Sequence, residues 1–243
     1  MTEIIRPQID LHGRVIAIAG AGGGLGPTVA ARLAGAGATI AVAGRSQDPL
    51  DRLARNLGLS EDRWDARSVD MLDPDATTAW CAALTERFDS VDALLHLVGG
   101  WRGGKPIAEA PLSDYEWLHD GLVRTLQNTS RAFHNALIAS EHGRFVLVGS
   151  QQAQTPSASN AAYAAAKAAA EAWTLALADS FADSAATANI VVVNAILTPQ
   201  MREESPEKSF KAFSSAEDIA DAIAYLCSDA AQKMNGQRLS LHS

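Results

Sequence analysis

A tyrosine and a lysine four residues apart carry the clearest chemical signal in this chain. Tyr163 and Lys167 lie in an alanine-rich run with high helix propensity, so their side chains share one helix face. Ser150 comes just after the apolar run at residues 144–148, which is typical of a buried strand. Residues 155–160, between them, have the small polar side chains of a loop. We therefore expect the loop to bring Ser150 next to Tyr163 and Lys167.

Such a trio suits general acid–base chemistry. A free tyrosine, with a pKa of about 10, exchanges protons poorly at neutral pH. A nearby ammonium favours the phenolate, so we expect Lys167 to lower the pKa of Tyr163 toward the working range. The Ser150 hydroxyl would hold the substrate oxygen while Tyr163 gives or takes its proton. The alternative is a packed helix with a polar tyrosine and an extended lysine, since Tyr-x-x-x-Lys alone is a common pattern.

The elements that must position this trio alternate between strands and helices. A buried strand at residues 14–19, a glycine-rich turn at 20–26, a helix at 27–36 and a strand at 39–43 form a βαβ unit. Further strands are expected at 64–69, 91–98, 144–148, 189–194 and 238–241. Further helices are expected at 50–57, 73–88 and 113–140, from a cap at Ser159 or Asn160 to about 181, and from the capping sequence at 214–217 to 227.

The fold class follows from this alternation. We predict an α/β fold, a doubly wound, Rossmann-like, mostly parallel sheet of about seven strands with helices on both faces. No linker, repeat or low-complexity segment interrupts the pattern, so residues 1–243 are predicted to form one domain, with an irregular lead-in at 1–11.

Charge and cysteine content exclude several classes of function. The formal charge of −8 argues against a general nucleic-acid surface and against a polybasic membrane patch. No apolar run approaches the roughly 20 residues that span a bilayer. Cys81 and Cys227 are isolated, so we expect buried thiols with no disulfide and no metal site. These features favour a cytoplasmic protein with no nucleic-acid or membrane partner.

The glycine-rich turn has the composition of a phosphate-binding loop. Residues without a Cβ let the backbone approach a pyrophosphate, and the next helix offers free N–H groups. Gly20, Gly24 and Gly26 do not have the Gly-x-Gly-x-x-Gly spacing, and such a turn can also serve only to pack a helix on a sheet. Its place after the first strand favours dinucleotide binding. Arg45 follows the second strand, where an arginine pairs with the 2′-phosphate of NADP, so NADP is favoured and NAD remains possible.

Taken together, these motifs resemble the short-chain dehydrogenase/reductase family over residues 13–241. The resemblance rests on Gly20-x-x-x-Gly24-x-Gly26, Asp70 after the third strand, and Ser150 ahead of Tyr163-x-x-x-Lys167. It implies an NAD(P)-dependent oxidoreductase whose catalytic residues are Ser150, Tyr163 and Lys167. The cofactor contacts that it implies come from Gly20, Gly24, Leu25, Gly26, Asp70, Met71, Val98, Gly99, Tyr163, Lys167 and Thr198.

The chain departs from the family pattern near the implied site. The family's Asn-Asn-Ala-Gly segment begins here with His96, which we interpret as structural rather than as a metal ligand. The family asparagine seven residues after a tryptophan is replaced by Arg124. Arg124 either lies near Lys167 and depresses its pKa or points elsewhere, and Asn128, one turn further, is the candidate substitute. The loop before Thr198 is short, and residues 202–211 are expected to form a mobile substrate lid.

The leading hypothesis is an oxidoreductase that interconverts a small-molecule alcohol and a carbonyl by hydride transfer. The alternative is a non-catalytic nucleotide-binding or regulatory protein on the same scaffold, and a weaker one is elimination or epimerisation chemistry. Trp101 either stacks on the substrate or shields its loop. The resemblance also implies a homodimer or homotetramer, because the helix that carries Trp173 often meets its symmetry mate in this family.

Overall fold

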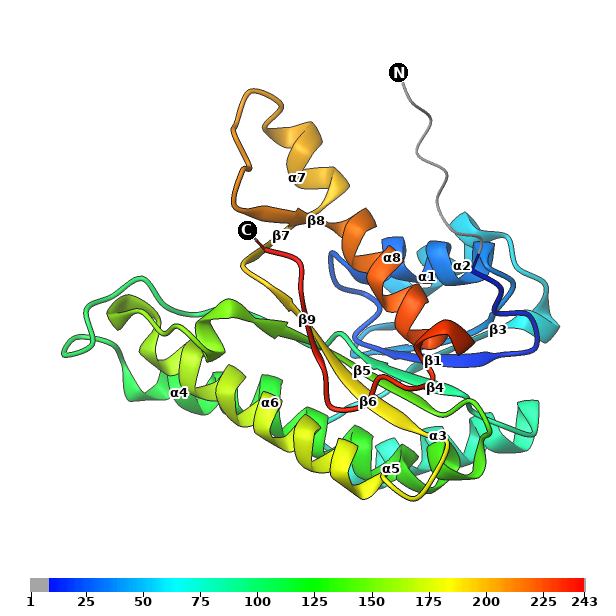
Figure 1. Ribbon diagram of the computed structural model, residues 1–243. Helices are drawn as coiled ribbons and strands as arrows, with labels where there is room; N and C mark the ends of the chain where they lie inside the picture. Colours follow the sequence, from blue (N-terminus) through cyan, green and yellow to red (C-terminus); the bar gives the residue numbers. More distant parts are fainter. Residues whose placement is uncertain (1–8, 243) are drawn as a thin grey trace.

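Seven parallel strands form the central sheet of the computed structural model, which describes residues 9–242 (Figure 1). Because the strands are parallel, their carboxyl ends all lie at one edge of the sheet. The strand order is β3-β2-β1-β4-β5-β6-β9, and its reversal between β1 and β4 creates a topological switch point at that edge. The predicted doubly wound fold is therefore confirmed. The strands are β1 (Val15–Ala19), β2 (Thr39–Gly44), β3 (Trp64–Ser68), β4 (Ala93–His96), β5 (Arg144–Ser150), β6 (Thr187–Val193) and β9 (Arg238–Ser240).

Helices cover both faces of this sheet (Figure 1). Alternate residues of a strand point to opposite faces, so Ile16 and Ile18 enter one apolar core while Ala17 and Ala19 enter the other. The first core is closed by α1 (Gly26–Gly35), α2 (Gln47–Leu57) and α8 (Ala216–Cys227). The second is closed by α3 (Pro74–Phe88), α5 (Thr125–Ala139) and α6 (Ala161–Ser180). Short 3-10 turns occur at Glu61–Arg63, Gln151–Ala153, Ala158–Asn160 and Asp229–Ala231.

The helix predicted at residues 113–140 is interrupted. It begins as α4 (Leu112–His119), widens into a π-helical turn at Asp120–Arg124 and continues as α5. A π turn inserts one extra residue, so side chains beyond it are shifted by one position relative to an uninterrupted helix. The seven-residue spacing from Trp117 to Arg124 crosses this turn, so in the structure it does not select the side chain on the same helix face as Trp117.

A second, two-stranded sheet lies beside the carboxyl edge, and its strands were not predicted from the sequence. Its strands are β7 (Ala195–Leu197) and β8 (Phe213–Ser215), which pair in parallel around the short helix α7 (Pro199–Glu204). Thr198 starts α7, because its Oγ1 accepts a hydrogen bond from the Met201 N–H at 3.2 Å and proline occupies the first turn. The segment predicted as a lid at residues 202–211 thus begins inside a helix.

Candidate active site

Helix α6 brings the three predicted catalytic residues together at the end of β5. The Lys167 Nζ donates a hydrogen bond to the Val148 carbonyl at 2.9 Å and lies 5.9 Å from the centre of the Tyr163 ring. The Tyr163 hydroxyl is hydrogen-bonded to the side chain of Ser150. Ser150 and Lys167 are buried and Tyr163 is half-buried. The arrangement therefore has a phenol and an alcohol in contact above a buried ammonium.

Burial governs the proton affinities of this trio. It lowers the pKa of Lys167 to about 8, against the opposing effect of the Glu171 carboxylate. It also raises the pKa of Tyr163, and the hydrogen bond with Ser150 only partly offsets this effect. The expected lowering of the Tyr163 pKa was therefore wrong for this structure, because burial outweighs the effects that favour the phenolate. Tyr163 is in its protonated, proton-donating form at neutral pH.

His96 fills the first position of the altered family segment and is a satisfied core residue. Its Nε2 lies 3.3 Å from the Thr125 hydroxyl and its Nδ1 lies 3.1 Å from the Thr129 hydroxyl. Burial, helped by the charge of Lys167, lowers the pKa of His96 to about 3, so the ring is neutral. Residues 9–242 contain no group of three His, Cys, Asp or Glu side chains that could hold a metal ion.

Arg124 points away from the site. Its side chain is 55% exposed, and its Nε lies 3.3 Å from the Asp120 carboxylate one turn earlier on the helix. Of the two interpretations of Arg124, the structure supports the one in which it points elsewhere. The π turn explains this orientation, because the extra residue places buried Thr125, rather than Arg124, on the face of Trp117.

Asn128 does not substitute for the family asparagine. Its Nδ2 donates to the main-chain oxygens of Met71 and Leu72, at 3.0 and 3.1 Å, and so ties α5 to the end of β3. Thr125 is one lining residue that the sequence did not mark. It lines the cleft at the carboxyl edge of the sheet, and its hydroxyl donates to the Gly121 carbonyl at 2.9 Å. No sequence signal marked it, because its position depends on the π turn.

A cleft of about 410 Å³ runs along the carboxyl edge of the sheet from β2 to α5. Six of the predicted cofactor residues line it, namely Gly20, Arg45, Asp70, Met71, Val98 and Gly99. The other lining residues were not predicted, although some are neighbours of predicted ones: Gly22, Gly23, Gly44, Ser46, Pro49, Val69, Leu72, Leu97, Gly100, Trp117, Asp120, Gly121, Leu122 and Thr125.

The walls of this cleft suit a nucleotide. Gly20 has a φ of +84°, and a Cβ there would lie 2.7 Å from the Val98 backbone nitrogen, so only glycine lets the two strand ends approach. The N-terminus of α1, with its free N–H groups, follows the glycine turn. Arg45 is exposed at one end of the cleft, and Asp48 does not line it. The donor set therefore fits a phosphate-bearing ligand.

The remaining predicted residues lie outside the lining of the cleft. Gly24, Leu25 and Gly26 form the turn into α1, where a Cβ on Gly26 would clash with the Ala21 carbonyl and the Leu25 side chain is buried. Thr198 lies beside this turn, since a Cβ on Gly24 would be 3.1 Å from its Cγ2. Tyr163 packs in one apolar cluster with Leu122, a lining residue, so the trio stands next to the cleft.

The glycine-rich loop after β4 is fastened to the start of α6. The Trp101 Nε1 donates to the Asn160 side-chain oxygen at 3.1 Å, and the Gly104 N–H donates to the Ser159 carbonyl at 2.8 Å. Asn160 thus occupies the N-cap position, but its side-chain oxygen accepts the hydrogen bond from Trp101 instead of capping the helix. Trp101 is 60% exposed, so the indole anchors the loop while most of its surface remains free.

Fold and cleft together define a Rossmann-type α/β protein with a nucleotide-sized groove at its switch point. A family model for short chain dehydrogenase matches residues 14–209, and the chain belongs to this family of oxidoreductases. The chain is 25% identical over 254 residues to 2,3-dihydroxy-2,3-dihydro-p-cumate dehydrogenase of Pseudomonas putida, with 100% of this chain and 98% of the relative covered.

Two further proteins are similar to this chain, one in sequence and one in fold. The 3-oxoacyl-(acyl-carrier-protein) reductase FabG of Escherichia coli is 25% identical, with 96% of this chain and 98% of the relative covered. A short-chain type dehydrogenase/reductase from Mycobacterium ulcerans has the same fold, with a TM-score of 0.87, 22% identity, and 96% of this chain and 89% of that chain covered. Among residues 9–242, no helix has the length and apolarity to cross a membrane.

Proposed function

We propose that this protein is an NADP-dependent oxidoreductase that interconverts an alcohol and a carbonyl group of a small molecule, with Ser150, Tyr163 and Lys167 as its catalytic residues. The observation that carries this proposal is the hydrogen-bonded pair of Tyr163 and Ser150 above the buried ammonium of Lys167. Both relatives are named for dehydrogenase or reductase chemistry, which supports the reaction type.

The residues of the chain divide the work of proton transfer. When bound, the nicotinamide cofactor supplies or accepts the hydride. In the direction of carbonyl reduction, the Ser150 hydroxyl donates a hydrogen bond to the substrate oxygen and Tyr163 donates its proton to that oxygen. The charge on Lys167 then stabilises the phenolate that Tyr163 becomes. Alcohol oxidation reverses these steps and needs Tyr163 to lose its proton first, so the raised pKa of Tyr163 favours reduction at neutral pH.

The cleft residues would hold the cofactor. Main-chain N–H groups of the glycine turn and of the start of α1 suit the pyrophosphate, because residues without a Cβ let a ligand approach the backbone closely. Asp70, Met71, Val98 and Gly99 would border the adenosine half, while Thr198 would approach from the β7–α7 side. Arg45 and Ser46 at the open end suit a 2′-phosphate, which supports NADP over NAD.

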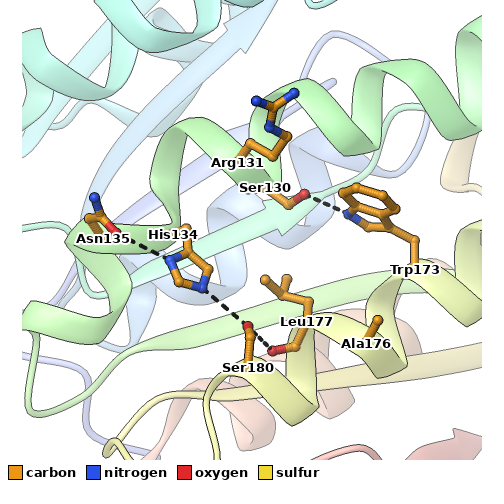
Figure 2. Close-up of a pocket in the computed structure, with 8 residues that line it drawn as sticks. All are labelled: Ser130, Arg131, His134, Asn135, Trp173, Ala176, Leu177 and Ser180. Atoms are coloured by element: carbon orange, nitrogen blue, oxygen red, sulfur yellow. Dashed lines mark hydrogen bonds between the residues drawn. The ribbon is translucent and has the colours of Figure 1, made fainter.

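The outer face of α5 and α6 is the candidate contact for a homodimer or homotetramer. A groove of about 330 Å³ lies between the two helices. Figure 2 shows the residues that line it: Ser130, Arg131, His134, Asn135, Trp173, Ala176, Leu177 and Ser180. Within the chain, the Trp173 indole N–H donates to Ser130 at 2.9 Å, so part of this side chain already packs against α5. A substitution of exposed Ala176 by glutamate should split the oligomer, which light scattering measures directly.

The chain is further proposed to act as a single domain in the cytoplasm. The central sheet draws strands from both ends of the chain, which supports one folding unit. Cys81 and Cys227 are free and buried, as suits a reducing compartment. Partial proteolysis of the full chain should therefore give no stable half-size fragment.

A substrate screen tests the enzymatic proposal. We expect NADPH consumption with at least one carbonyl in a broad panel of ketones and aldehydes, and a loss of at least about a hundredfold in kcat for Tyr163→Phe. The matched control is Tyr225→Phe on α8, which should keep full activity. Tryptophan fluorescence measures NADPH binding separately. Normal NADPH binding without turnover on any substrate would favour the alternative, a non-catalytic nucleotide-binding protein.

A further inference from the structure

Helix α6 carries a third ionisable side chain on the same face as Tyr163 and Lys167. Glu171 lies four residues beyond Lys167 on the same face of the helix, and its side chain is only 3% exposed. Burial of a carboxylate costs folding free energy unless the carboxylate is paired and hydrogen-bonded, so the partners of Glu171 indicate its role.

One oxygen of Glu171 is well paired and the other is not. Oε2 accepts a hydrogen bond from the Arg238 Nε at 2.7 Å, and the Gln154 side-chain nitrogen lies 3.5 Å away. Oε1 is buried and has no hydrogen-bond partner among the described residues. Arg238 lies on the edge strand β9, two strands away from β5, so the carboxylate is held from the edge of the sheet.

The unpaired oxygen rests on the strand that carries the site. A Cβ at Gly149 would lie 2.8 Å from the Glu171 Oε1, so the carboxylate occupies the space that any other residue at 149 would fill. Three consecutive residues of β5 are therefore engaged by three successive turns of α6. Val148 binds Lys167, Gly149 contacts Glu171, and Ser150 binds Tyr163.

Among residues 9–242, Glu171 is the carboxylate whose charge raises the pKa of Lys167. The other titratable groups near the ammonium are Tyr163 on the same helix and His96 on β4, and both are neutral at pH 7. Arg238 contacts this region through its ion pair with Glu171. Burial favours loss of the Lys167 proton, and the carboxylate opposes that loss.

We propose that Glu171, held in place by Arg238, is a positioning residue that keeps Lys167 charged and fixed against Val148, so that the ammonium stays below Tyr163. This inference rests on the proposed catalytic role of Lys167. It also assigns a purpose to Gly149, which leaves room for the carboxylate, and to Arg238 at the edge of the sheet.

Nuclear magnetic resonance of the full chain, labelled selectively in lysine, tests this role without any turnover. Lys105, Lys208, Lys211 and Lys233 are the other lysines, and Lys167→Met identifies the resonance of Lys167. We expect Glu171→Gln to shift the titration of Lys167 to lower pH, so that at about pH 8 the protonated fraction falls at least about threefold. Glu171→Asp, which keeps the charge but shortens the reach, should give a smaller shift and serves if the glutamine variant does not fold.

The matched control is Asp65→Asn. Asp65 is equally buried, at 3% side-chain exposure, and is paired with Arg67 and Arg87 at the opposite edge of the sheet. This variant should lose stability but leave the Lys167 titration unchanged. An unchanged titration in both Glu171 variants, or an equal shift in Asp65→Asn, would overturn the inference.

Activity then separates this inference from the proposed function. If the protein turns over a carbonyl, Glu171→Gln should move the alkaline limb of kcat/KM to lower pH by as much as the Lys167 resonance moves. A resonance shift in a protein without turnover would uphold the positioning role and remove only the enzymatic assignment. Turnover with no shift of either the limb or the resonance would remove only the positioning role.

Discussion

The Nζ of Lys167 donates a hydrogen bond to the carbonyl oxygen of Val148 at 2.9 Å. This contact joins the helix that carries the phenol to the strand that carries the serine, within two residues of Ser150. A charged group that is bonded to a strand backbone has a fixed position, unlike a lysine that extends into solvent. The geometry of the site therefore depends on how α6 docks on β5.

Replacement of Arg124 should leave the chemistry intact. The guanidinium is exposed and, among residues 9–242, pairs only with Asp120 on its own helix, so its loss removes a surface ion pair of less than about 1 kcal/mol. We expect kcat and KM of Arg124→Ala to stay within about twofold of the unchanged protein. The contrasting variant is Thr125→Val, whose buried hydroxyl meets His96 and which should lower activity or stability clearly. A large effect of Arg124→Ala would show that Arg124 acts in the site.

Loss of Arg45 should discriminate between the two nicotinamide cofactors. Because the guanidinium suits the 2′-phosphate that only NADP carries, Arg45→Ala should weaken NADPH binding at least about tenfold and change NADH binding little. Fluorescence titration with both nucleotides gives the two dissociation constants. Arg55→Ala, on the exposed side of α2, is the control and should change neither. Equal losses for NADPH and NADH in Arg45→Ala would contradict the assignment to NADP.

Two glycines should respond oppositely to an added methyl group. At Gly20 the positive φ and the 2.7 Å approach to the Val98 nitrogen forbid a Cβ, so Gly20→Ala should lower the free energy of unfolding by about 2 kcal/mol or more and weaken nucleotide binding. At Gly35, in the last turn of α1, a Cβ meets nothing within 4 Å, so Gly35→Ala should be neutral or stabilising by up to about 1 kcal/mol. Urea denaturation measures both, and tolerance of Gly20→Ala would refute the close approach.

His96 should make the protein sensitive to acid. Its pKa is lowered from 6.5 to about 3 in the folded chain, so below about pH 6.5 the unfolded chain binds a proton that the folded chain does not. The free energy of unfolding therefore falls as the pH falls through this window, by about 2 kcal/mol between about pH 7 and pH 5 for this group alone. Urea denaturation at both pH values should show a smaller loss in His96→Gln.

The control for this linkage is His12→Gln, since the His12 side chain is 80% exposed. This variant should keep the full pH dependence of the unchanged protein. His96→Gln is expected to be less stable than the unchanged protein at neutral pH, because it disturbs the contacts with Thr125 and Thr129. An identical pH dependence in the two variants would contradict the burial of a neutral imidazole.

The local elements were readable from the sequence because their signals are local. Apolar runs such as residues 144–148 and 189–194, the glycine turn, and the capping sequence at 214–217 each need only a few neighbouring residues, and the corresponding strands, turn and helix are all present. The four-residue spacing of Tyr163 and Lys167 fixed their common face for the same reason. The order of strands and helices then implied the doubly wound sheet, because parallel strands need helical crossovers.

Contacts between distant segments were decided only by the tertiary structure. Glu171 meets Arg238 because β9 pairs with β6 beside β5, and Thr198 meets Gly24 because β7 and α7 turn back over the carboxyl edge. The π turn at Asp120–Arg124 is equally invisible in the sequence, since one inserted residue costs little locally and is stabilised by packing. The sequence thus determined which residues share a helix or strand. The packing of these elements, which depends on burial over the whole sheet, decided which side chains meet and which buried charges have a partner.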